Sequence, residues 1–66
     1  MNKYQEQILR ELMSADTSLT NETLGSILNV SAKTIQRNTK DLKIILQVNG
    51  ATLETKPSVG STLYIH

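Results

Sequence analysis

The stretch that decides the fold is "TLGSILNVSAKTIQRNTKDL", residues 23–42. Apolar residues fall at helical spacing on both sides of a short break, which predicts two helices joined by a tight turn. Asn29 tolerates the left-handed conformation that a sharp helix exit needs, and Ser31 is a favourable N-cap. Gly25 has no Cβ, so we expect close approach where the two helices cross. The stretch therefore predicts a helix over about 21–28, a three-residue turn and a second helix that starts at Ser31.

The residues before this stretch predict one further helix, over about 3–15. Asn2 and Gln5 have the spacing of a reciprocal cap at its start, and Thr20 is the expected N-cap of the next helix. The predicted apolar face of the first helix consists of Tyr4, Ile8, Leu9, Leu12 and Met13, and that of the second of Leu24, Ile27 and Leu28. Small polar residues, "SADTS", separate the two helices.

The end of the helix that begins at Ser31 has two interpretations. Its expected buried face consists of Ile35, Thr39, Leu42, Ile45 and Leu46. The β-branched run at 44–48, followed by Asn-Gly at 49–50, would also fit a strand paired with 51–55 through a tight turn. We favour a helix that continues to about 47 and stops at the Asn-Gly pair, because the apolar stripe keeps its helical spacing.

The last part of the chain predicts a β-hairpin. Residues 51–56 and 62–66 alternate between apolar and polar side chains, and "PSVGS" between them has the composition of a loop. The expected inward side chains are Leu53, Leu63 and Ile65, and Tyr64 is expected to point outward. The predicted fold class is therefore mainly α (α+β), with three helices and a C-terminal hairpin in one domain over 1–66.

The composition excludes several classes of function. The chain has 66 residues and no cysteine, so it has neither a disulfide framework nor a thiolate metal site. It has no apolar run near the roughly 18 residues of a membrane span, and its polar N-terminus is not a signal peptide. The one histidine, His66, is terminal, and no nucleophile has a neighbouring base. We expect no enzymatic activity, no cofactor, no metal and no membrane contact, and the absence of cysteine fits the cytoplasm.

The charge is unevenly distributed along the chain. Residues 1–30 carry two Lys or Arg and four Asp or Glu, a net charge of −2, whereas residues 31–66 carry five and two, a net charge of +3. Four of the seven Lys and Arg residues lie on the helix that is predicted to begin at Ser31, namely Lys33, Arg37, Lys40 and Lys43. A basic stripe along one helix is typical of a nucleic-acid interface.

The stretch resembles the helix-turn-helix of bacterial winged-helix transcription regulators. It is most similar to the N-terminal domain of antiterminator-like sugar-operon regulators that carry phosphotransferase-controlled domains, and it is also similar to that of the biotin repressor. The matching positions are Leu24, Leu28, Asn29, Val30, Ser31, Thr34, Ile35, Arg37 and Leu42. The segment "LETKPSVG", residues 53–60, resembles the wing, so the resemblance covers about 3–66.

The resemblance implies a three-helix winged helix-turn-helix and sequence-specific binding of double-stranded DNA, with a recognition helix over about 31–46 in the major groove. Arginine can bond both major-groove acceptors of guanine, and glutamine can pair with adenine. The expected base-contacting residues are therefore Lys33, Gln36 and Arg37. The residues expected at the DNA backbone are Ser31, Thr34, Lys40, Lys43 and Lys56.

Three features differ from the family pattern. Asn38 stands in place of an acidic residue, which removes a possible intrahelical ion pair, and Thr39 in place of an aliphatic one, which is expected to weaken the core. The loop lacks the usual lysine and first glycine of the wing, and Ser61 stands where an aromatic residue is common. We therefore expect the recognition helix, rather than the wing, to make the main contacts with DNA.

The resemblance also has implications for partners. The family carries long regulatory domains after this module, so we expect the chain to be excised from a longer regulator that forms a homodimer through those C-terminal regions. No small molecule is expected in this domain. The alternative is a winged-helix module that binds another protein, because winged helices often do so and the predicted wing carries little charge.

Overall fold

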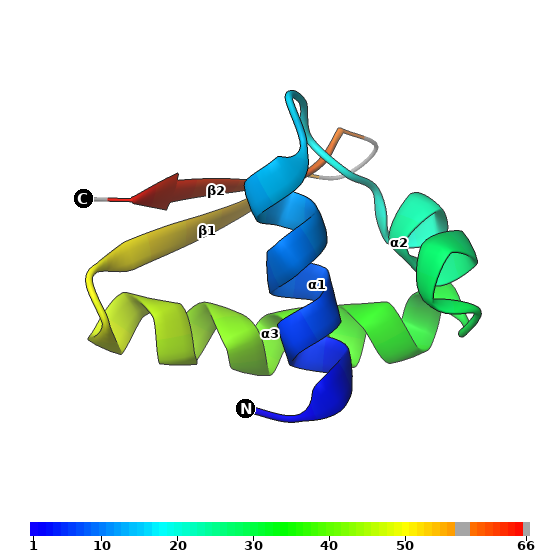
Figure 1. Ribbon diagram of the computed structural model, residues 1–66, viewed down its shortest axis with the longest axis horizontal. Coiled ribbons are helices and arrows are strands. Elements are labelled where there is room, and N and C mark those ends of the chain that lie inside the picture. The colour runs from blue at the N-terminus through cyan, green and yellow to red at the C-terminus, as the bar shows by residue number, and fades with distance from the viewer. Residues whose placement is uncertain (57–58, 66) are drawn as a thin grey trace.

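The computed structural model describes residues 1–56 and 59–65. Three helices precede a two-stranded antiparallel sheet: α1 (Lys3–Ser14), α2 (Asn21–Leu28), α3 (Ala32–Val48), β1 (Ala51–Lys56) and β2 (Gly60–Ile65). The long helix α3 forms the base of the molecule, α1 crosses it, α2 packs near its N-terminal end and the hairpin lies over its C-terminal half (Figure 1). The predicted fold class, that of a winged helix-turn-helix, is confirmed.

The helix starts follow from capping side chains. Asn2 and Gln5 form the predicted reciprocal cap of α1, with two side chain-to-backbone hydrogen bonds of 2.8 Å. The hydroxyls of Thr20 and Ser31 each accept a hydrogen bond of 3.1 Å from the backbone N–H three residues further on. These bonds satisfy amide groups that have no partner inside a helix. Local sequence therefore sets where all three helices begin.

Helix α3 ends at Val48, so the helical interpretation of this segment is confirmed and a strand over 44–48 is wrong. Leu42 and Leu46 lie one turn apart on the buried face, and this face would be lost in an extended strand. The Asn49 side chain donates a 2.8 Å hydrogen bond to the carbonyl oxygen of Ile45 and helps to end the helix. None of the described helices is long and apolar enough to span a bilayer.

One apolar cluster holds the elements together, and its buried members are Ile8, Leu12, Leu24, Ile35, Leu42, Leu46 and Leu53. The sequence overestimated the width of two apolar faces. Tyr4 and Met13 of α1 and Ile27 of α2 are exposed, whereas Gln5 is buried. Because α1 crosses α3 steeply, only the central stripe of α1 is covered (Figure 1).

The hairpin has one register from end to end, with Leu53 paired to Leu63 and Ala51 paired to Ile65. Leu53 is fully buried, Leu63 is partly buried and Tyr64 is exposed, as predicted. The inward placement of Ile65 is wrong, since 74% of it is exposed. Strand β2 ends away from α1, and this end of the sheet is not covered (Figure 1). The predicted loop residues 57–58 and His66 lie outside the described residues.

A third extended segment joins the edge of the hairpin. Leu19 and Ser61 exchange two backbone hydrogen bonds, of 3.0 and 2.7 Å, and form an isolated antiparallel bridge. Ser61 is completely buried there, and its hydroxyl is hydrogen-bonded to that of Thr55 at 3.1 Å. Gly60 has a φ of +110°, and a Cβ at this position would overlap the backbone of Leu19. The bridge ties the loop end of the hairpin to the segment just before α2.

Candidate nucleic-acid interface

The turn between α2 and α3 presents the start of α3 to solvent. Asn29 ends α2 in the predicted left-handed conformation, with φ 59° and ψ 46°. A Cβ on Gly25 would lie 2.7 Å from the carbonyl oxygen of Val30, so the close approach is to the turn rather than to the axis of the second helix. Leu24 and Ile35 are fully buried between the two helices. This packing fixes the direction in which the N-terminal end of α3 projects into solvent.

The two hydroxyl residues at the start of α3 are bonded to each other. The Ser31 hydroxyl is 3.0 Å from that of Thr34 and accepts the Thr34 backbone N–H at 3.1 Å. Ser31 is exposed and Thr34 half-buried. Their free lone pairs and hydrogens lie at the positive end of a helix of 17 residues, where an anionic oxygen is favoured. The structure thus brings together two of the side chains expected at the DNA backbone.

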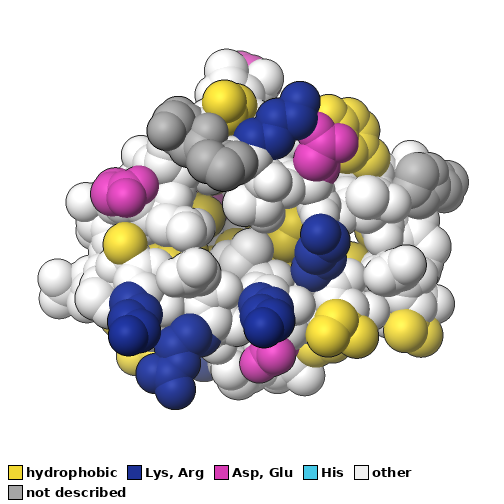
Figure 2. Space-filling view, turned by 180° about the vertical axis from the view of Figure 1, so that it is seen from behind, with side chains coloured by type: hydrophobic (Ala, Val, Ile, Leu, Met, Phe, Trp, Pro, Cys, Tyr) yellow, Lys and Arg dark blue, Asp and Glu magenta, His cyan; other side chains and the backbone are white. Residues whose placement is uncertain are grey.

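The exposed side of α3 carries the predicted cations. Lys33, Gln36, Arg37, Lys40 and Lys43 are all exposed, whereas Ile35, Thr39 and Leu42 are buried on the opposite side. Dark blue Lys and Arg side chains spread across one face of the molecule in Figure 2. Among the described residues, the four α3 cations have no ion-pair partner. They are therefore free to bind an external anion.

The exposed side of α3 is divided into two rows. Gln36, Lys40 and Lys43 face the hairpin, because all three line a hollow between α3 and β1. Lys33 and Arg37 line none of the depressions on that side, and they lie one turn apart on the more outward row. The outward row can enter a groove of a nucleic-acid duplex. The second row can contact the backbone of a nucleic-acid strand that passes between α3 and the hairpin.

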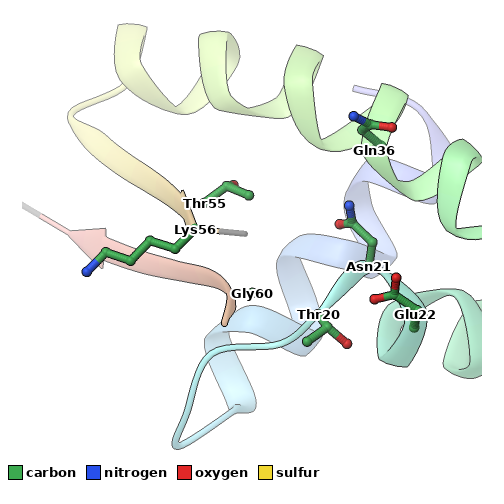
Figure 3. A pocket seen from close by; sticks show the side chains of 7 residues that line it. All are labelled: Thr20, Asn21, Glu22, Gln36, Thr55, Lys56 and Gly60. Atoms are coloured by element: carbon green, nitrogen blue, oxygen red, sulfur yellow. The ribbon is translucent and has the colours of Figure 1, made fainter. Parts of the chain in front are cut away.

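The space between α3, the start of α2 and the hairpin consists of two adjoining hollows, of about 440 and 230 Å³. They share Asn21, Gln36 and Thr55, whose side chains lie around the larger hollow in Figure 3. The smaller hollow also has Lys40 and Lys43 in its wall. Carbon atoms form most of the wall of the smaller hollow, and the ammonium groups of Lys40 and Lys43 are the part of it that can bind a phosphate. The larger hollow is also lined by Glu22, whose carboxylate would repel one.

The fifth predicted cation, Lys56, lies on the hairpin. Its Nζ is 3.2 Å from a carboxylate oxygen of Glu54, and both side chains are exposed. In Figure 3 its side chain runs away from Asn21 and Gln36, although the residue lines the larger hollow. Lys56 therefore stands apart from the α3 cations in both position and pairing.

The structure adds several polar residues that the sequence analysis had not assigned to the site. Asn21 and Thr55 come from α2 and β1 and meet only because both elements pack on α3.

Asn38 accepts a 2.9 Å hydrogen bond from the Asn2 side chain and donates one of 2.8 Å to the carbonyl oxygen of Thr34. The sequence gives no signal for the first of these bonds, because its partners are 36 residues apart.

The described residues contain no group of three or more His, Asp or Glu that could hold a metal ion. Glu22 adds a carboxylate to the wall of the larger hollow, and the exposed side of α3 presents hydroxyl, amide and cationic groups. Such groups bind phosphate oxygens and base edges.

Residues 5–61 match the model of a family that is described as an HTH domain. The match covers more than half of the chain and spans α2, the turn and α3. Searches of curated proteins and of solved structures found no match.

Proposed function

Because the chain belongs to this helix-turn-helix family, we propose that it is the sequence-specific, double-stranded DNA-binding domain of a bacterial transcription regulator. Helix α3 would lie in the major groove, as second helices of this motif do. The observation that carries the proposal is the exposed side of α3, with four cations and Gln36, none of the cations being paired within the described residues.

The DNA sequence would be recognised by Lys33 and Arg37, the outward row of α3, together with Gln36. Arg37 offers two donors to the acceptors of a guanine, Lys33 one ammonium group, and Gln36 a donor and an acceptor that match adenine. All three are exposed and lie in the first two turns of the helix. This end enters the groove in helix-turn-helix proteins.

The backbone contacts would come from both ends of this surface. Ser31 and Thr34 would meet a phosphate at the positive end of α3. Lys40 and Lys43 would meet the strand that passes along the hollow between α3 and β1. Lys56 would be a further, peripheral contact, limited by its ion pair with Glu54.

We further propose that this domain works as one half of a dimer in the bacterial cytoplasm. A single module of this size offers an interface of about 600–1,000 Å², so useful specificity needs a second half-site. The resemblance to antiterminator-like sugar-operon regulators supports a homodimer formed by C-terminal regions of a longer chain.

The proposal is tested with a duplex selected from a random-sequence library and titrated by fluorescence anisotropy at several salt concentrations. Arg37→Ala should weaken binding by about 1–3 kcal/mol, or roughly 5- to 150-fold, and relax one base position. Arg10→Ala removes the same charge from α1, on a surface shared with Met13, and should leave binding unchanged.

Failure to select any duplex, or no detectable binding at about 50 mM salt, would refute the DNA function, because electrostatic binding is strongest there. NMR shift changes provide a second measurement. A DNA reader should show them at 31–43, whereas a protein-binding module would show none there on adding duplex.

A further inference from the structure

The hairpin carries an ion pair at the edge of the proposed DNA surface. Glu54 and Lys56 lie two residues apart on β1, so their side chains share one face of the strand. Their charged atoms are 3.2 Å apart, and the side chains are 46% and 63% exposed. An exposed pair of this kind is weak and can exchange partners.

The pair makes the hairpin electrically neutral, in contrast to α3. Lys40 and Lys43, which line the hollow between α3 and β1, have no carboxylate partner among the described residues. Of the cations expected at the DNA, Lys56 is thus the one that is paired with a carboxylate among the described residues. Any DNA phosphate that approaches Lys56 must compete with the Glu54 carboxylate, and it is also repelled by that carboxylate.

We propose that Glu54 limits the affinity of this domain for DNA by holding Lys56 away from phosphate. This inference rests on the proposed DNA function and concerns a residue that the function itself does not require. The sequence-independent part of binding would then come mainly from α3, and Lys56 would add little to it. Because a genome offers a large excess of non-operator sites, a neutral hairpin would leave less of the protein on them.

The test measures binding of a scrambled duplex as a function of salt concentration. One added phosphate contact steepens the plot of log affinity against log salt by about 0.9. Glu54→Gln frees Lys56 and should therefore steepen the slope by about 0.9. It should raise affinity by about tenfold at 50 mM salt and about threefold at 200 mM salt. Lys56→Gln should leave the slope of the parent domain almost unchanged.

Two further variants isolate the cause. Glu6→Gln makes the same change in net charge on α1, where Glu6 lies beside Met1 and Met13. It should change neither the slope nor the affinity by more than about twofold. In the double variant Glu54→Gln/Lys56→Gln the gain should disappear, because the freed ammonium group is absent.

The inference is overturned if Glu54→Gln behaves like Glu6→Gln, or if the double variant keeps the full gain. A fall of about 0.9 in the slope of Lys56→Gln alone would also overturn it, because Lys56 would then already make a full phosphate contact. These results leave the DNA function intact. If the parent domain binds no duplex, the proposed function fails, and this inference fails with it.

Discussion

Two junctions in this molecule are built on a glycine that touches another backbone segment. In the first, Gly25 packs against the turn at Val30, five residues further along the chain. In the second, Gly60 packs against Leu19, which is far away in the sequence, between α1 and α2. The first junction sets how α3 leaves α2, and the second attaches the hairpin to the start of α2.

The difference between the junctions lies in what else they require. Gly25 sits inside a helix, so its only special feature is the missing Cβ. Gly60 lacks room for a Cβ and also has a φ of +110°, which L side chains rarely adopt. The distant junction is therefore the less tolerant of substitution, even though it lies farther from α3.

The largest effect is expected for Gly60→Ala. The new Cβ would overlap the Leu19 carbonyl group and would also force an unfavourable φ, which together should cost about 3 kcal/mol or more. A domain of this size has a total stability of only about 3–10 kcal/mol. We expect much of the population to be unfolded, as measured by circular dichroism during urea titration.

The matched control for this variant is Gly50→Ala. Gly50 also has a positive φ, of +83°, but a Cβ there would meet nothing within 4 Å. Its cost should be about 1 kcal/mol, from the backbone conformation alone. If both variants lost the same stability, the contact with Leu19 would not be the cause.

A smaller loss is expected for Gly25→Ala. Alanine favours the helix by about 1 kcal/mol, but its Cβ would lie 2.7 Å from a backbone oxygen that cannot rotate away. The net loss of unfolding free energy should be about 1–2 kcal/mol. Ser26→Ala, at an exposed position on the same helix, should be neutral or slightly stabilising. A stabilised Gly25→Ala would show that the turn relaxes freely.

The smallest effect, and a gain, is expected for Thr39→Val on α3, between the two junctions. Thr39 is 6% exposed, and its hydroxyl oxygen has no hydrogen-bond partner among the described residues. Valine has the same shape without the unpaired polar atom, so unfolding should cost about 1 kcal/mol more. The control is Thr34→Val, which removes a hydroxyl bonded to Ser31 and should not stabilise. A loss of stability in Thr39→Val would mean that the hydroxyl has a partner in solution, such as water.

Local patterns were enough for the helices. The caps at Asn2, Thr20 and Ser31 and the left-handed Asn29 depend on side chains within three residues of the backbone groups they serve. The end of α3 could also be predicted. The apolar residues of its buried face keep their helical spacing as far as Leu46, inside the segment 44–48 that could otherwise have formed a strand. The alternation of apolar and polar residues in the hairpin correctly predicted that Leu53 is buried, but it wrongly predicted the same for Ile65. Alternation shows which face of a strand is apolar, and it does not show how far along the strand that face is covered by other elements.

The candidate site was predicted in part. The spacing of the cations placed them on the exposed side of α3, and their assignment to bases or backbone remains a prediction. The departures from the family pattern acquired explanations only in three dimensions. Asn38 meets the cap residue Asn2, and Ser61 is completely buried at the bridge to Leu19, with its hydroxyl hydrogen-bonded to that of Thr55.

The order of elements, the helix starts and the charge of α3 were thus determined by the sequence, because each depends on residues a few positions apart. Tertiary structure alone decided which side chains share the hollow beside α3 and where Gly60 meets Leu19. The physical reason is that contacts between distant segments depend on how whole elements pack, and packing is a property of the assembled core rather than of any local pattern.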